Sequence, residues 1–316
     1  MSDIRQMPLF PARPQSPDDI NRHTALAHTL DLFAQYLAQE GKSEHTIKAF
    51  KSDLNLLGEH TDAETPIGQY TTTDLNGFLN WLEHGRGVPC SRKSYARRVT
   101  TLKVYFKWLH TIGAIAQDPA KAILQRSGPA PLSYALNAAE IRRAITVAQG
   151  FKKGDQMDYR PEMLFRLLLD TGIKKSEAMR LTPNAIDRTN SERPMLLIKY
   201  KVRNVYKERK IEVGVEWVKL LDLYLQQYGL TDVIFNCTAR NLEYILTDIG
   251  EQADIPVKLS FEIMRWTCAV YDYLGGLEEE EIREKLGLSE TSWYETSNKI
   301  KKLAEIQVSE KMKSNN

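Results

Sequence analysis

Apolar residues recur every three or four positions along most of the chain, the spacing that places them on one face of a helix. In residues 29–41 this stripe includes Leu30, Phe33 and Leu37, and the segment ends at Gly41. The same spacing predicts helices over residues 43–60, 72–85, 91–113 and, as a short fifth helix, 118–124. We therefore expect a small all-helical domain over residues 23–126.

Two segments without this periodicity border the helical domain. Residues 1–22 are rich in proline and polar side chains, which is typical of a flexible tail. Residues 127–135, with the sequence SGPAPLSYA, have the small and proline-rich composition of an interdomain linker. A second domain is therefore expected over residues 136–316.

The second domain is predicted to be mainly helical with one small β element. Asn137 and Glu140 form a capping box at its first helix. Gly172 is expected to end a buried helix in the left-handed conformation, with Ser176 and Glu177 opening the next helix. Alternating apolar residues predict strands over 195–200 and 210–213, and further helices follow over 215–229, 239–254, 261–276, 278–287 and 289–312. The fold class is therefore α+β, mainly α with a small β-hairpin.

Composition and charge narrow the class of protein without identifying a ligand. The 316 residues carry a formal net charge of +2, so a surface for a polyanion must come from local clusters of cations. Cys90, Cys237 and Cys268 are far apart, lack the spacing of a metal site, and are expected to be reduced thiols in a cytoplasmic protein. We expect no cofactor, no metal, no signal peptide and no membrane-spanning segment.

Cations gather in three places along the chain. Residues 91–110 contain no acidic residue but carry Arg92, Lys93, Arg97, Arg98, Lys103 and Lys107. The hairpin carries Lys199, Lys201, Arg203, Lys207, Arg209 and Lys210, opposed by Glu208 alone. The third cluster is Lys174 and Lys175, with Arg265 as a candidate neighbour. A solvated charged face is the alternative for the first cluster, but phosphate contacts release counterions and add affinity, so the three clusters predict a clamp around duplex DNA.

The order of these elements resembles the tyrosine recombinase, or phage integrase, family over residues 24–306. Residues 41–57 and 91–123 are similar to the family's helical core-binding, SAM-like domain. LLLDTGIKKSEAMRL is similar to the segment that carries the first catalytic arginine, and the hairpin to the one that bears the catalytic lysine. LSFEIMRWTCA resembles the His-x-x-Arg helix, and LGLSETSWYE the Leu-Gly-His segment before the tyrosine. The resemblance implies a core-binding domain followed by a catalytic-type domain, with DNA as the ligand.

In this family two arginines hold a phosphate, a tyrosine attacks phosphorus, and histidines and a lysine move protons. Carried over to this sequence, the first arginine position is occupied by Lys174 and the second by Arg265. Lys201, with Arg203 nearby, is the best match to the catalytic lysine. Lysine lacks the planar fork of arginine, so the resemblance implies a weakened hold on phosphate.

The remaining catalytic positions are also replaced. Glu262 and Leu288 stand at the two histidine positions, and Ser297 stands at the tyrosine position, three residues after Tyr294. All six histidines precede the linker, so the second domain contains no histidine. Loss of one preorganised donor costs about 100- to 1000-fold, and loss of a general acid or base about 100- to 10,000-fold. We therefore interpret the chain as a catalytically inactive DNA-binding protein of the tyrosine recombinase type, in an accessory, architectural or regulatory role.

Two alternatives stay open. An active, divergent recombinase would use Tyr294 as the nucleophile, with Lys174 in place of arginine. A helix-turn-helix transcription regulator would use residues 278–303, whose pattern fits that motif. Besides duplex DNA, the expected partners are a second copy or an active recombinase. Ile300, Leu303 and Ile306 would then dock on a neighbour or cover the chain's own core. The expected location is the cytoplasm, on the nucleoid when DNA is bound.

Overall fold

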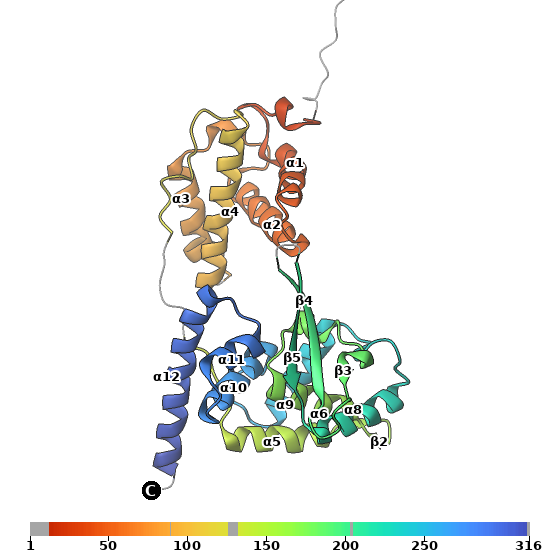
Figure 1. The fold of residues 1–316 in the computed structure, drawn as a ribbon. Coiled ribbons are helices and arrows are strands. Elements are labelled where there is room, and N and C mark those ends of the chain that lie inside the picture. Colours follow the sequence, from red (N-terminus) through yellow and green to blue (C-terminus); the bar gives the residue numbers. More distant parts are fainter. Residues whose placement is uncertain (1–12, 89, 126–131, 203–204, 315–316) are drawn as a thin grey trace, which may run out of the picture. The chain divides into compact units, whose positions relative to one another are not determined.

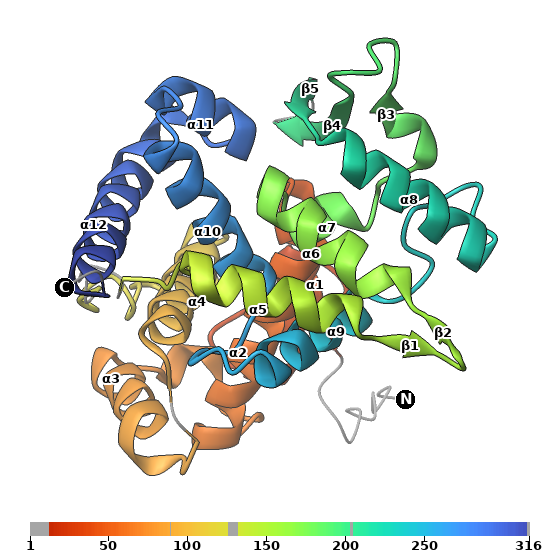
Figure 2. The same ribbon diagram turned by 90° about the horizontal axis from the view of Figure 1, so that it is seen from below.

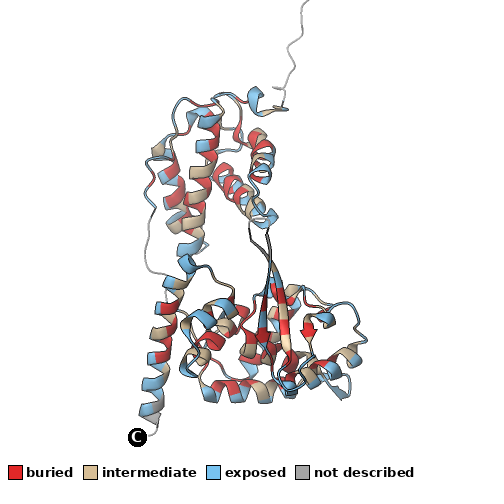
Figure 3. Ribbon diagram, viewed as in Figure 1, coloured by how far each residue is buried: buried red, intermediate tan, exposed pale blue. Residues whose placement is uncertain are grey.

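The computed structural model describes residues 13–88, 90–125, 132–202 and 205–314, and the chain divides into two units, residues 1–129 and 130–316 (Figure 1). Each unit has its own core of buried apolar side chains (Figure 3). Within the described ranges, no helix combines the length and the apolar character needed to span a membrane. The predicted fold class, mainly helical with small antiparallel sheets, is confirmed.

The first unit is built on α1 (Leu26–Gln39), α2 (Glu44–Thr61), α3 (Thr72–Asn80) and α4 (Arg92–Thr111). A π-helical turn, Trp81–Gly85, follows α3, and 3-10 turns lie at Pro17–Asp19 and Ile67–Gln69. Helix α2 begins where Ser43 Oγ accepts a hydrogen bond from the Thr46 amide, as expected of a capping serine. Leu54 and Phe106 are fully buried, which confirms the stripes seen in the sequence.

Two expectations for this unit differ from the structure. The predicted helix over residues 118–124 is wrong, because residues 119–122 form turns. The Pro119 carbonyl oxygen accepts a hydrogen bond from Thr72 Oγ1 of α3 at 2.7 Å. This contact takes the place of the backbone hydrogen bond that a helix would form at that carbonyl. Ile20 lies in the predicted flexible tail but is only 5% exposed and packs in the helical core. Residues 1–12 of that tail lie outside the described residues.

The second unit alternates helices with short strands. It contains α5 (Ala138–Gln149), β1 (Lys152–Lys153), β2 (Gln156–Met157), α6 (Tyr159–Thr171), α7 (Lys175–Ala178), a 3-10 turn (Pro183–Ala185), β3 (Ile186–Asp187), β4 (Met195–Val202), β5 (Val205–Glu212), α8 (Val215–Tyr228), α9 (Ala239–Gln252), α10 (Phe261–Leu274), α11 (Glu279–Leu286) and α12 (Glu290–Ser314). Strands β3, β4 and β5 form an antiparallel sheet in that order, with Leu197 opposite Lys210. The hairpin is longer than predicted, because charged residues that were read as a turn continue β5.

Helix α6 forms the centre of the second unit. It packs against α5, α8, α9 and α10, and Figure 2 shows α5 and α6 side by side. Met163, Leu164 and Leu168 on α6 are fully buried. The predicted capping box also forms, since Asn137 accepts from the Glu140 amide and Glu140 accepts from the Asn137 amide. This packing fixes the end of α6, where the candidate site begins.

The amphipathic part of α12 packs on its own unit. Ile300 and Leu303 are 1% and 5% exposed and join a cluster with Val270 of α10 and Ile282 of α11. Ile306 is 43% exposed. The sequence left open whether this part of α12 docks on a neighbour or covers the chain's own core. Ile300 and Leu303 cover the chain's own core.

Candidate functional site

The elbow between α6 and α7 requires a glycine for two reasons. Gly172 has φ +54°, a conformation that L side chains rarely adopt. A Cβ at this position would also lie 3.1 Å from Leu286 and 3.2 Å from Cys268. Beyond the glycine, the amide of Lys174 donates to Glu177 Oε2 at 2.8 Å. The carboxylate of Glu177 therefore caps the start of α7, but the helix begins at Lys175, so Ser176 lies inside it and does not open it as predicted.

A buried ion pair joins this elbow to the hairpin. Arg209 on β5 donates from Nη1 and Nη2 to the two carboxylate oxygens of Glu177, at 2.9 and 2.8 Å. Both residues are less than 10% exposed. Burial alone would raise the pKa of Glu177, but the hydrogen bonds and charge of Arg209 outweigh burial and hold that pKa below its ordinary value. Arg209, predicted to contact DNA, thus points inward to a carboxylate of its own chain.

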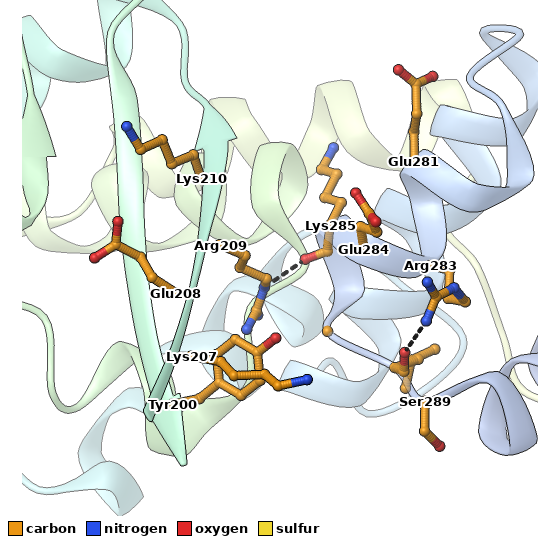
Figure 4. A pocket seen from close by; sticks show the side chains of 12 residues that line it. Tyr200, Lys207, Glu208, Arg209, Lys210, Glu281, Arg283, Glu284, Lys285 and Ser289 are labelled. Atoms are coloured by element: carbon orange, nitrogen blue, oxygen red, sulfur yellow. Dashed lines mark hydrogen bonds between the residues drawn. The ribbon is translucent and has the colours of Figure 1, made fainter. Parts of the chain in front are cut away.

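The same guanidinium also contacts α11. Arg209 Nε donates to the Lys285 carbonyl oxygen at 2.9 Å, a bond drawn in Figure 4. The adjacent turn leaves no room for a side chain, because a Cβ on Gly287 would lie 2.8 Å from Arg209 Nη1. The carbonyl groups at a helix C-terminus carry partial negative charge, so this position favours a cation. Arg209 therefore connects β5, α7 and α11.

Arg265 on α10 is held by carbonyl groups at two helix ends. Its Nη1 donates to the Gly172 oxygen after α6, and its Nη2 to the Leu286 oxygen at the end of α11, each at 2.5 Å. Burial lowers the pKa of Arg265, and the nearby charge of Arg209 lowers it further. A guanidinium has five N–H donors, and the contacts described for Arg265 use two of them.

Lys174 completes a group of three cations around one carboxylate. Its side chain is exposed in part, and its pKa is lowered by burial and by the charges of Arg265 and Arg209, although Glu177 opposes this. The structure thus brings Lys174, Arg265 and Arg209 together, two of which were predicted to hold a phosphate. The positive charge exceeds the single negative charge of Glu177. The side chain of Lys201 and the whole of Arg203 lie outside the described residues, so their assigned roles stay predictions.

The other positions assigned to catalytic residues differ in burial and in contacts. Glu262 is exposed in the first turn of α10, and Leu288 packs against the cluster beneath α12. Ser297, at the tyrosine position, is 8% exposed, and its Oγ donates to the Tyr294 carbonyl oxygen at 3.3 Å. Tyr294 is 78% exposed, while its neighbour Trp293 packs inward. Among the described contacts, none joins the Tyr294 ring to the three cations.

A polar pocket of about 700 Å³ lies between β5 and α11. Figure 4 shows Arg209 extending from β5 toward α11, with Lys207 and Tyr200 beside it. Glu281 and Glu284 line the α11 side. Arg283 and Lys285 of α11 and Glu208 of β5 line it as well, so both sides of the pocket carry charges of both signs. Across the described residues, no group of His, Cys, Asp or Glu side chains has the arrangement of a metal site.

Some of the cations predicted on the hairpin and the elbow are exposed, and others pair with a carboxylate. Lys207 and Lys210 are exposed, and so is Lys199 on β4. Lys175 on α7 pairs with Glu243 on α9, with 3.1 Å between Nζ and Oε1. Among the described residues, Lys199, Lys207 and Lys210 are the exposed lysines of the hairpin, and no ion pair is described for them.

Helix α4 in the first unit shows the same division. Arg92, Lys93 and Lys107 are exposed, and Lys103 is half-buried. Arg97 and Arg98 instead face Asp53. Asp53 lies on α2, outside the α4 segment whose lack of acidic residues predicted a free basic cluster. The contact distance is 2.6 Å for Arg97 Nη1 to Asp53 Oδ2. A buried carboxylate on a neighbouring helix carries no signal within the α4 sequence.

Part of the chain is similar in sequence to proteins of the tyrosine recombinase type. Residues 30–112 match the family model of the phage integrase N-terminal SAM-like domain. The chain is 31% identical to tyrosine recombinase XerC of Mycobacterium sp. (strain JLS) over 160 residues, and 32% identical to XerC of Mycobacterium tuberculosis (strain ATCC 25177 / H37Ra) over 161 residues. These matches cover 50% of this chain and 53% of each relative, so the chain spans about half the length of the curated relatives it matches.

Solved structures show the same fold at lower identity. XerH site-specific recombinase bound to palindromic difH substrate has a TM-score of 0.70 at 18% identity, covering 90% of this chain and 84% of XerH. A lambda integrase (75–356) dimer bound to a COC′ core site has a TM-score of 0.68 at 16% identity, covering 86% and 94%. The chain is thus similar to tyrosine recombinases in sequence over about half of its length, and in fold over most of it.

Proposed function

We propose that this protein binds duplex DNA and does not cut it. It would act in the cytoplasm, on the nucleoid, as an accessory, architectural or regulatory protein. Its partners would be duplex DNA and either further copies of itself or an active recombinase. The relatives named above are tyrosine recombinases, and two of the structural neighbours are described as bound to DNA sites, which supports DNA as the ligand.

Exposed cations support the binding half of this proposal. Arg92, Lys93 and Lys107 on α4, and Lys207 and Lys210 on β5, are exposed and available to phosphates. Each neutralised phosphate of a duplex releases condensed counterions, and the gain in affinity shows as a dependence on salt. A net charge of only +2 makes these local groups, and not the chain as a whole, the source of attraction.

One observation carries the inactive half of the proposal. The nucleophile position holds the buried Ser297, and the nearest tyrosine, Tyr294, is 78% exposed with no described contact to Lys174 or Arg265. Arg265, at the second arginine position, donates to two backbone carbonyl oxygens. A phosphate at this site would meet cations but no placed nucleophile and no histidine. Loss of a preorganised donor and of acid–base groups each costs about 100-fold or more in rate.

The helix-turn-helix alternative is weaker on electrostatic grounds. Helix α11, the left-handed Gly287 and α12 form the predicted helix, turn and helix. However, Glu278, Glu280, Glu281 and Glu284 are exposed on and before α11 and would repel phosphates. We therefore keep α4 and the hairpin as the proposed contact surfaces.

The binding proposal is tested by a salt series on a random-sequence duplex. The double variant Arg92→Gln and Lys93→Gln should bind more weakly and lower the slope of log K against log salt by about 2. A matched control, Lys219→Gln and Lys302→Gln, removes two exposed lysines from α8 and α12 and should leave the slope unchanged. Equal effects of the two double variants would show that attraction depends on total charge and would contradict the assigned surface.

A further inference from the structure

A charged cluster at the start of α4 is separate from the site described above. Cys90 directly precedes the N-cap residue Ser91, and its side chain is half-buried. Arg98 lies further along the same helix, and its side chain is only 10% exposed. Its Nη1 donates to Cys90 Sγ at 2.8 Å. The Arg98 side chain, nine-tenths buried, therefore points at the sulfur of a half-buried cysteine.

Arg98 shares the Asp53 carboxylate with Arg97, and its own ion pair with Asp53 is the longer of the two. Asp53 Oδ2 accepts hydrogen bonds from Arg97 at 2.6 Å and from Thr101 at 2.9 Å. Asp53 Oδ1 and Arg98 Nε lie 3.5 Å apart, and both are buried without a hydrogen-bond partner. Two guanidinium groups thus share one carboxylate, so the three side chains together carry a net positive charge. A negatively charged sulfur on Cys90 would balance the cluster.

The helix supplies a second source of stabilisation for a negative sulfur. Helix α4 has 20 residues, and the partial positive charge of a helix N-terminus attracts anions. The competing contact of the thiol, from Cys90 Sγ to the Ser91 carbonyl oxygen, is long at 3.7 Å. Thiols beside an arginine and a helix N-terminus are the ones that react as nucleophiles.

The other two cysteines provide internal comparisons. Cys237 is half-buried like Cys90, but burial raises its pKa, which disfavours the reactive thiolate. Cys268 is 1% exposed, and burial raises its pKa to about 12. Cys268 also has a hydrogen bond with a cation, Lys285, but it is buried, whereas half-buried Cys90 accepts from Arg98 at 2.8 Å.

We propose that Cys90 is a reactive thiol, oriented by Arg98, and a site of reversible modification by small-molecule disulfides. The Cys90 sulfur loses its proton to solvent and attacks one sulfur of the disulfide. A new S–S bond forms, the old S–S bond breaks, and the second half leaves as a thiolate. Cys90 is oxidised and the small disulfide is reduced in the same step. This proposal does not depend on DNA binding, so either proposal can fail without the other.

The test measures the modification rate of each cysteine in the folded, full-length protein. Oxidised glutathione is added in excess at pH 7, samples are quenched with acid, and mixed disulfides at each cysteine are counted by mass spectrometry. We expect Cys90 to react roughly tenfold faster than Cys237, and Cys268 to stay unmodified. Dithiothreitol should restore the free Cys90 thiol. A Cys90 rate equal to or below that of Cys237 would overturn the proposal.

A pair of arginine variants tests the role of Arg98. Arg98→Gln should slow the modification of Cys90 by roughly tenfold. Arg97→Gln is the matched control, because Arg97 contacts the same carboxylate but not the sulfur, and it should leave the Cys90 rate unchanged. Equal rates in wild type and a folded Arg98→Gln variant would contradict the assigned role. If circular dichroism shows that Arg98→Gln is unfolded, the wild-type comparison of Cys90 with Cys237 decides the proposal.

Discussion

Helix α4 and the elbow before α7 both place arginines beside a buried carboxylate, but they leave different cations for a ligand. On α4, Arg97 and Arg98 pair with Asp53 of α2, while Arg92 and Lys93 are exposed. At the elbow, the arginines are turned inward to Glu177 and to backbone carbonyl groups. The comparison teaches that an arginine in a basic cluster can belong to the framework, and that exposed cations beside it carry the proposed DNA contacts.

The largest effect is expected when Arg209, the buried arginine that pairs with Glu177 at the elbow, is removed. Arg209→Ala leaves the carboxylate of Glu177 buried and unpaired, and should lower the free energy of unfolding by about 3–5 kcal/mol. The control is Arg193→Ala, which removes a pair with Glu212 that is 69% and 49% exposed. That loss should be much smaller in urea unfolding, because solvent screens an exposed ion pair. Similar losses for both variants would contradict the framework role of Arg209.

The turn after α11 offers a smaller and more local perturbation. Gly287→Ala places a methyl group 2.8 Å from Arg209 Nη1 at a residue with φ +59°, so strain and a displaced ion pair should together cost about 1–3 kcal/mol. Gly229→Ala is the matched control, because Gly229 has φ +62° but nothing within 4 Å of the added Cβ. Denaturant midpoints should show the larger loss for Gly287→Ala. Equal losses would mean that the contact with Arg209 has no energetic weight.

Acid should weaken the elbow through Glu177. Its pKa is lowered in the folded chain, so the stabilisation is fully present above the unfolded value of about 4.3 and is lost as pH falls through the folded value. Glu177→Gln cannot titrate and should flatten this part of the curve of unfolding free energy against pH. Unchanged acid dependence in that variant would assign the effect to other carboxylates.

The smallest expected effects separate exposed from paired cations on α4. Lys107→Gln removes an exposed cation and should lower the salt slope of DNA binding by about 1. Arg97→Gln removes a cation that is bound to Asp53 and should change the slope much less. A slope change for Arg97→Gln as large as for Lys107→Gln would show that Arg97 contacts DNA in addition to pairing with Asp53.

The sequence predicted those features that depend on local spacing. Helix positions, the left-handed Gly172 and the caps of Ser43 and Asn137 follow from apolar periodicity and from local hydrogen bonding, and the structure confirms them. The turns after Pro119 could not be predicted in this way, because they depend on a contact with Thr72 that is distant in sequence.

The candidate site was predictable only in part for the same reason. The meeting of Lys174 with Arg265 follows from the family pattern. The inward direction of Arg209 depends on Glu177 and on the carbonyl end of α11, which come from other parts of the chain. Charge clusters along a sequence therefore identify a basic region, while the pairing of each cation needs the folded structure.

The central claim, binding without cleavage, is tested most directly by one duplex that traps covalent intermediates. A labelled duplex, nicked so that the strand end is lost after attack, is incubated with the protein and divided between a native gel and a denaturing gel. We predict a shifted, salt-sensitive complex in the native gel and no protein-linked label in the denaturing gel. A covalent band that disappears in Tyr294→Phe would contradict the claim and establish Tyr294 as a nucleophile.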